Sequence, residues 1–224
     1  SFTFAAMVPM QVYNTLKVPC ERERLMRIRH LIIGGGAISD ELAQMIKPLS
    51  NAVWSTYGMT ETLSHIALRR LNGPDASLWY TPFDGVGISL NADGCLVIDA
   101  PEVCAEPLVT NDIAQLRTDD RTGKTLFRIK GRKDNVVCSG GIKIQIEEVE
   151  EALRPYLSDP FMIVKKQDEM LGEKAILLTE SADLTHIEEI CRNTLPKYWV
   201  PREFLHIDHL PLTETGKPKR SGAF

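Results

Sequence analysis

The pattern of apolar residues changes twice along this chain of 224 residues, and these changes constrain the fold more than any other feature. Residues 7–47 predict an α/β unit: a helix (MVPMQVYNTL), a strand ending in HLIIGG, and a second helix (SDELAQMIKPL) with Ser39 and Asp40 as candidate caps. Residues 77–128 instead hold short β-like runs between Gly, Pro, Asn and Asp. These runs predict a small antiparallel barrel or distorted sheet, made of GVGISL, GCLVIDA, EPLVT, AQLRT and LFRIK.

After residue 130 the pattern alternates between strands and helices and resembles βαββαβ. The predicted elements are the strands VVCSGG and IKIQI, the helix EEVEEALRPYL, the strands FMIVKKQ and KAILLTE, the helix LTHIEEICRNTL and the strand EFLHIDHL. This unit has the size of a small independent domain, so we place a domain boundary near Gly131, between residues 1–130 and 131–224. The expected fold class is α/β (α+β).

The composition favours small-molecule ligands. With 26 Lys and Arg against 30 Asp and Glu, the net charge of -4 gives no electrostatic reason to expect nucleic acid or an anionic membrane as partner. The five cysteines include no C-x-x-C pair, which argues against a disulfide framework or a zinc site and favours the cytoplasm. No apolar run approaches the roughly 20 residues of a membrane span. Because the chain lacks an initiator Met, we expect it to be part of something longer.

Three stretches carry chemical groups in suggestive positions. Gly34, Gly35 and Gly36 follow a predicted strand and precede a helix, so the backbone there allows a ligand to approach closely, although tight packing explains such a turn equally well. In TYGMTE (residues 56–61), Tyr57 suits stacking on a planar ring, Thr60 a phosphate and Glu61 a divalent metal.

Each of these residues also has an ordinary structural explanation. Taken singly, the structural explanations are favoured: Tyr57 suits a half-buried wall, Thr60 a helix cap, and Glu61 the first turn of a helix. In the third stretch, LPLTETGKPKR (residues 210–220), Lys217, Lys219 and Arg220 form a basic tail that is usually solvated. The Thr-x-x-Gly-Lys order nevertheless provides a long cation suited to neutralising a phosphate or carboxylate.

These stretches and GRKDNVVCSGG (residues 131–141) occur in the order found in the C-terminal half of adenylate-forming enzymes. The chain resembles this superfamily of acyl-CoA synthetases, adenylation domains and luciferases over essentially all its length. TYGMTETLSHIA looks most like the o-succinylbenzoate-CoA ligase branch. The resemblance implies the C-terminal part of a large adenylating domain, formed by the α/β unit and the small barrel, followed by a small α+β lid domain that is mobile.

The resemblance also implies roles for individual residues of the first unit. The loop of residues 34–36 would border the nucleotide and acyl pocket. Tyr57 would stack on adenine, with Gly58 in the same nucleotide-binding stretch. Thr60 would contact the α-phosphate, and Glu61 would be the magnesium ligand.

Further roles fall on the second half of the chain. Asp112 and Arg132 would hold the ribose; the family usually has Gly before the acid, where this chain has Asn111, a residue that tolerates a left-handed backbone. Asp134 would be the hinge, and Lys217 would reach the carboxylate and α-phosphate during adenylation. The loop Ser139, Gly140 and Gly141 would approach the CoA channel, and Ile146 stands where the family commonly has Pro.

The implied reaction joins a carboxylic acid to CoA by way of an acyl-adenylate, with ATP, Mg²⁺ and CoA as cofactors and co-substrates. Lys217 and a Glu61-bound Mg²⁺ would neutralise the negative charge of the first step. Rotation about Asp134 would exchange Lys217 for the residue 139–141 loop in the second step. The branch implies o-succinylbenzoate as the acid, in menaquinone biosynthesis.

Candidate substrate contacts are Ser64 and His65, with Ser39 as a further candidate. On a helix starting near Thr60, His65 is equally explained as a surface residue. His206 and His209 have metal-ligand-like spacing but lie in a predicted strand edge, which argues against a metal role.

One part of the family pattern is absent from the sequence. Family members are longer, and their first half carries a Ser/Thr/Gly-rich loop ending in Pro-Lys that holds the β- and γ-phosphates of ATP. No such segment occurs here, so we expect this chain alone to be inactive. Two alternatives stay open: an adenylation domain that loads amino acids or aryl acids onto a carrier protein, and a non-catalytic nucleotide-binding module. The sequence does not predict an oligomeric state.

Overall fold

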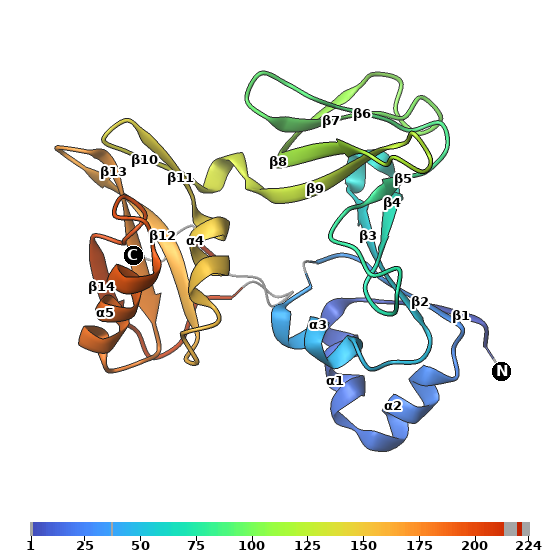
Figure 1. Ribbon diagram of the computed structural model, residues 1–224, viewed down its shortest axis with the longest axis horizontal. Coiled ribbons are helices and arrows are strands. Elements are labelled where there is room, and N and C mark those ends of the chain that lie inside the picture. The colour runs from blue at the N-terminus through green and yellow to red at the C-terminus, as the bar shows by residue number, and fades with distance from the viewer. Residues whose placement is uncertain (1, 37, 213–218, 221–224) are drawn as a thin grey trace. The chain divides into compact units, whose positions relative to one another are not determined.

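The chain folds as two compact units (Figure 1). This computed structural model describes residues 2–36, 38–212 and 219–220, with the backbone alone at Asp40. The first unit comprises the residues up to Thr110 and Ala114–Ile129, and the second comprises Asn111–Ile113 and the residues from Lys130 onwards. That these units are the two domains of an adenylating enzyme stays a prediction.

Three helices and a five-stranded sheet open the first unit. The strand order is β1-β2-β3-β4-β5; β1, β2 and β3 are parallel, and β4 and β5 are antiparallel to their neighbours. Leu31 and Ile33 alternate along β2 and pack with Val12 and Leu16 of α1 and Val53 of β3 into one apolar core. The elements are β1 (Phe4–Met7), α1 (Pro9–Lys17), α2 (Pro19–Met26), β2 (His30–Ile33), α3 (Asp40–Ile46), β3 (Ala52–Gly58), β4 (His65–Arg70) and β5 (Thr81–Pro82).

The first residues of helices α1 and α3 show which sequence signals determine where a helix begins in this unit. The Ser39 hydroxyl accepts a hydrogen bond from the Leu42 N–H at 3.2 Å, which confirms the predicted cap of α3. The first predicted helix begins too early, because Met7 ends strand β1 and the helix starts only at Pro9. Proline is favoured at the first helical position, where its missing N–H costs nothing.

An antiparallel sheet forms the rest of the first unit, with the order β6-β7-β8-β9. The predicted runs EPLVT and AQLRT are not separate strands but parts of β8, because the polar residues between them continue the extended backbone. Leu96, Ile98 and Phe127 fill its core. The bounds are β6 (Gly87–Leu90), β7 (Cys95–Asp99), β8 (Leu108–Thr118) and β9 (Thr125–Arg132).

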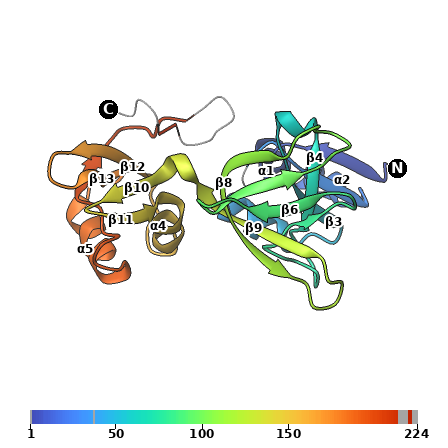
Figure 2. The same cartoon turned by 90° about the horizontal axis from the view of Figure 1, so that it is seen from above.

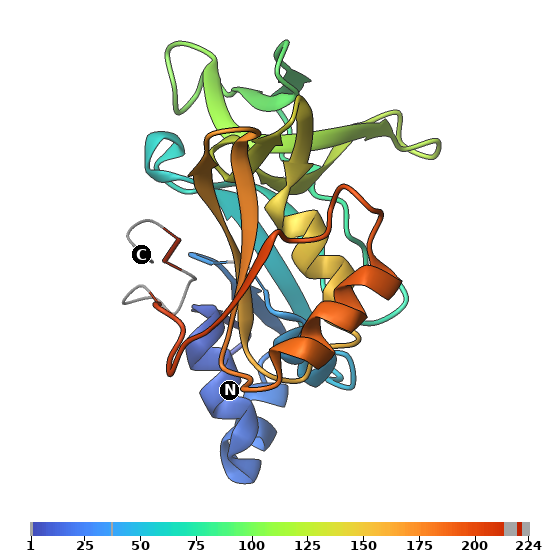
Figure 3. The same cartoon turned by 90° about the vertical axis from the view of Figure 1, so that its left-hand side faces the viewer.

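The second unit contains every element predicted after residue 130. Its sheet has the order β11-β10-β13-β12, with β14 parallel to β13. Helices α4 and α5 lie on one face of this sheet, as Figures 2 and 3 show, and the segment after β14 lies on the other. The bounds are η2 (Lys133–Asn135), β10 (Val136–Ser139), β11 (Ile142–Gln145), α4 (Ile146–Leu153), β12 (Phe161–Asp168), β13 (Gly172–Thr179), α5 (Leu184–Thr194) and β14 (Glu203–His206).

A buried ion pair fixes the chain after this segment. Arg220 donates to the Glu150 carboxylate at 2.7 Å and to the Ile163 carbonyl at 3.1 Å, and the Glu150 side chain is only 8% exposed. Burial raises the pKa of Glu150, and the Arg220 charge opposes that rise. The expectation of a solvated basic tail is therefore wrong for Arg220, although Lys219 is exposed.

None of the described helices is long and apolar enough to cross a membrane.

Replacing Arg220 tests this ion pair. Arg220→Met should destabilise the second unit by about 3 kcal/mol, because it leaves the buried Glu150 carboxylate unpaired. A carboxyl group whose pKa is raised in the folded protein, such as that of Glu150, stabilises the fold below its unfolded pKa, and this stability is lost as pH rises through the folded pKa. The destabilisation by Arg220→Met should therefore be larger near about pH 8 than near about pH 5. Urea unfolding followed by circular dichroism measures both. Lys219→Met is the matched control, and equal unfolding midpoints for the two variants would contradict the ion pair's role.

Candidate functional site

The three parallel strands of the first unit end at one edge of the sheet. The register pairs Met7 with Ile33 and Ile33 with Ser55, so the residues that follow β1 and β2 gather beside the last residues of β3. In open α/β sheets, ligands bind outside the carboxyl ends of the strands. The edge therefore places residues 34–36 next to Tyr57 and the turn after it.

The glycine turn at this edge needs its glycine for packing. The Gly34 N–H donates to the Met7 carbonyl at 3.1 Å. A Cβ at Gly34 would lie 2.5 Å from the Thr56 hydroxyl, which itself donates to the Ile33 carbonyl at 3.4 Å. Gly35 adopts φ +76°, a left-handed conformation that glycine tolerates.

The turn after β3 is built by close backbone contact. A Cβ at Gly58 would lie 2.3 Å from the Ser64 carbonyl oxygen and 2.5 Å from the His65 Cα, so only glycine fits there. The buried Thr62 hydroxyl accepts from the Met59 N–H at 3.0 Å and lies 2.7 Å from the Ser64 carbonyl. Thr62 was missed by the sequence reasoning, although hydroxyl-to-backbone bonding within turns is common for threonine.

The expected helix starting near Thr60 is wrong. The chain makes one 3₁₀ turn, η1 (Thr60–Thr62), and Leu63 then adopts φ +59°, which ends helical geometry before β4 begins at His65. Thr60 and Glu61 are consequently exposed on a tight turn, and neither caps a helix.

The two candidate substrate residues lie at the end of this turn. The Ser64 hydroxyl and His65 Nδ1 are 3.1 Å apart. His65 is half-buried as the first residue of β4, and its ring meets Phe83 edge-on at 5.4 Å between centroids. The interpretation of His65 as a surface residue on a helix is therefore wrong.

Tyr57 belongs to an aromatic cluster. Its ring lies 5.0 Å from that of Phe127 and 5.7 Å from that of Tyr80, between centroids, and the Tyr80 hydroxyl bonds to Ser55 at 2.9 Å. These contacts fix the tyrosine ring, which remains half-buried rather than fully enclosed. The structure thus matches the interpretation of Tyr57 as a half-buried wall residue and leaves its stacking role a prediction.

In the second unit the structure brings the predicted ribose and hinge residues together. The Arg132 guanidinium bridges the Asp112 carboxylate at 3.4 Å and the Asp134 carboxylate at 2.8 Å. Asn111 lies within β8, so the left-handed backbone considered for it is not adopted.

The predicted CoA-channel loop is the tip of a hairpin. Ser139 pairs with Ile142, and both intervening residues have positive φ: +57° at Gly140 and +84° at Gly141. Positive φ at both positions of such a two-residue turn favours glycine. Lys217 lies outside the described residues; beside it in sequence, the Lys219 N–H donates to the Pro211 carbonyl at 2.8 Å.

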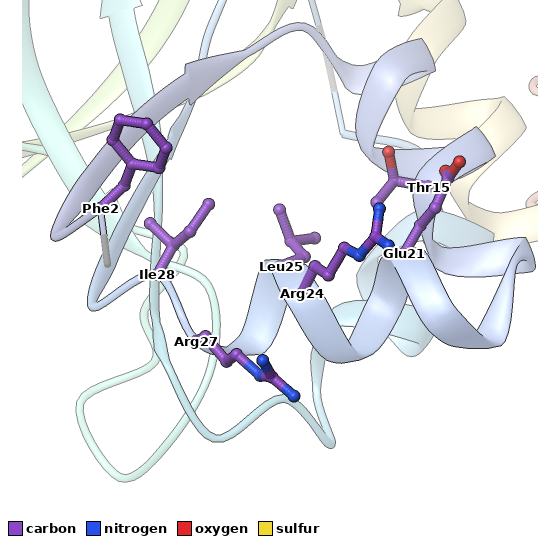
Figure 4. A pocket seen from close by; sticks show the side chains of 7 residues that line it. All are labelled: Phe2, Thr15, Glu21, Arg24, Leu25, Arg27 and Ile28. Atoms are coloured by element: carbon purple, nitrogen blue, oxygen red, sulfur yellow. The ribbon is translucent and has the colours of Figure 1, made fainter.

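A pocket of about 560 Å³ lies elsewhere in the first unit (Figure 4). Phe2 and Ile28 lie before strands β1 and β2, so this pocket is at the amino edge of the sheet, opposite the glycine turn. Both apolar and charged side chains line this pocket, among them Leu25, Arg24 and Arg27. None of the predicted site residues lines it.

The comparisons with known proteins show what this chain is similar to. No family model matches the chain. An acyl-CoA synthetase (AMP-forming)/AMP-acid ligase II-like protein from Dyadobacter fermentans has 31% identity, with 98% of this chain and 64% of that chain covered and a TM-score of 0.58. The relatives of this chain are therefore AMP-forming acyl-CoA synthetases, and the predicted resemblance to adenylate-forming enzymes is confirmed.

Two of the relatives are o-succinylbenzoate-CoA ligases. 2-Succinylbenzoate–CoA ligase of Listeria monocytogenes is 24% identical over 216 residues, which is 87% of this chain and 45% of that ligase. The chain thus spans about half the length of this curated relative. The o-succinylbenzoate-CoA synthetase of Bacillus subtilis, solved with ATP and a magnesium ion, shares the fold: TM-score 0.71, 21% identity, 98% of this chain and 51% of that chain.

Replacing Gly58 tests the geometry of the turn. Gly58→Ala should destabilise the first unit by about 1–3 kcal/mol, because the new methyl group meets backbone atoms that cannot rotate away. Thermal unfolding measures the loss. Gly94→Ala is a demanding control, since Gly94, unlike Gly58, has positive φ (+78°), which alone disfavours alanine, but has no atom within 4 Å of its Cβ position. A smaller loss for Gly58→Ala than for Gly94→Ala would contradict the close contact.

Proposed function

We propose that this chain is the nucleotide-binding and lid portion of an AMP-forming acid-CoA ligase. The observation that carries the proposal is the gathering of the glycine turn (residues 34–36) and the Tyr57–Gly58 strand end at the carboxyl edge of parallel strands. There Tyr57 and Gly58 would border the adenine, and Thr60 would contact the α-phosphate. Asp112 and Arg132 would hold the ribose hydroxyls.

Magnesium fits this arrangement only together with the nucleotide. Mg²⁺ takes one or two carboxylates and completes its shell with phosphate oxygens and water. The described residues hold no cluster of three or more metal-ligating side chains, but the exposed Glu61 offers one carboxylate beside Thr60. Bound there, the ion would supply positive charge where the phosphate becomes more negative, and Lys217 would add a second cation.

The acid would be o-succinylbenzoate, which carries two carboxylates and a keto group. The adjacent Ser64 hydroxyl and His65 ring would bind the group that does not react, with Ser39 as a further candidate. The names of the Listeria and Bacillus relatives support this choice. The product would enter menaquinone biosynthesis, in the cytoplasm. The comparisons do not favour the carrier-loading alternative or the non-catalytic module.

The second half-reaction would use the other unit. We propose that it swings about Asp134, withdraws Lys217 and brings the hairpin tip at Ser139, Gly140 and Gly141 to the thiol of CoA. The two-glycine turn presents backbone groups without side chains, which suits close approach to a slender pantetheine chain.

ATP–pyrophosphate exchange tests the function in the complete gene product that contains this chain. Exchange should depend on o-succinylbenzoate, and Glu61→Gln should lower it about 100-fold, the typical cost of losing one charge-stabilising group. Glu102→Gln, at another exposed carboxylate of the first unit, is the matched control and should leave exchange unchanged. Exchange with another aryl acid alone would contradict the substrate; no exchange with any acid would contradict the class.

A further inference from the structure

The segment that joins the two units is held to the start of helix α4 by side-chain hydrogen bonds. Asn135 donates its amide Nδ2 to Glu147 Oε1 at 2.5 Å, and Gln145 donates its amide Nε2 both to Glu147 Oε2 at 2.5 Å and to the Arg132 carbonyl at 3.1 Å. A salt bridge at 2.8 Å joins Lys130 to Glu148. All these partners belong to the second unit.

Gly131 makes this arrangement possible. Its backbone is buried, and a Cβ there would lie 2.4 Å from Gln145 Nε2 and 2.6 Å from Glu147 Oε2. The two side chains therefore occupy the space that any other residue at position 131 would need. This close approach involves the same two atoms as the hydrogen bonds and shows that the amide and the carboxylate are packed directly onto the joining segment.

Glu147 is the centre of the network. One carboxylate accepts from two amides, and hydrogen bonds to an ionised acceptor are stronger than neutral ones. Glu147 also lies in the first turn of α4, where the helix dipole favours negative charge. Its contacts reach the chain at Arg132, by way of Gln145, and at Asn135, so they hold the backbone on both sides of Asp134.

We propose that Glu147 is a positioning residue that latches the joining segment by holding Gln145 on the Arg132 carbonyl, so that movement about Asp134 requires the Gln145–Arg132 hydrogen bond to break. The latch is Glu147 with Asn135 and Gln145. It acts through the segment and touches neither substrate nor nucleotide. The proposed effect on catalysis rests on the proposed function, because only an enzyme with two half-reactions needs the units to rearrange. The effect on the conformation of the joining segment does not rest on the proposed function.

Hydrogen exchange on this chain without nucleotide tests the latch directly. In Glu147→Ala, amides of a peptide covering residues 130–137 should exchange about tenfold faster, because two charge-assisted hydrogen bonds no longer oppose local opening. Amides of β12 and β13 should keep their rates. Glu189→Ala, at an exposed glutamate of α5, is the matched control. Gly131→Ala should speed exchange in the same peptide, since its methyl group displaces both latch side chains.

The two half-reactions of the complete gene product give the second readout. The ratio of thioester formation from the acyl-adenylate to pyrophosphate exchange should change by about fivefold or more in Glu147→Ala, and stay unchanged in Glu189→Ala. Unchanged hydrogen exchange in Glu147→Ala would overturn the latch. Faster exchange with an unchanged ratio would overturn its catalytic role. Faster exchange in a protein that forms no adenylate would support the latch and overturn the proposed function.

Discussion

The contact of the Gly58 backbone with Ser64 and His65 is the constraint on which the first unit's candidate site depends. It forces the chain to reverse in one 3₁₀ turn, so that β4 returns antiparallel to β3 and Thr60 and Glu61 stay exposed. The buried Thr62 hydroxyl and the left-handed Leu63 complete the turn. Because β2 and β3 are parallel, the glycine turn after β2 lies beside the end of β3. Two short sequence motifs are thus brought together at one edge of the sheet.

The second unit combines an apolar core with polar attachments. Ile163 and Leu177 of the sheet pack against Leu153 of α4 in one core. The joining segment, residues 130–135, is held by Gln145, Glu147 and Glu148. Apolar packing gives a stable fold, whereas a few hydrogen bonds to exposed or half-buried groups can break and re-form at low cost. This combination suits the proposed movement, in which the unit would keep its shape while its connection changes conformation.

Local signals made much of the fold predictable from the sequence. The Ser39 cap and the Gly140–Gly141 hairpin depend on neighbours in sequence, as do the alternating strands after residue 130. The failures depend on contacts that no short pattern encodes: the turn at Thr60 is set by Gly58 meeting His65, and the half-buried Arg220 is paired with Glu150, which lies on a helix distant in sequence. The candidate site residues could be predicted from the family resemblance. The contacts of Glu147 could not, because no sequence pattern indicates them.

The most direct test of the central claim is an amide-shift titration of this chain with AMP. We expect the largest shifts at residues 34–36 and 57–61, at the carboxyl edge of the parallel strands. The pocket at the opposite edge provides an internal comparison, since Leu25 of α2 and Ile28, which precedes β2, line it at the amino edge of the sheet. Shifts confined to that pocket, or no shifts at the carboxyl edge at saturating AMP, would contradict the claim.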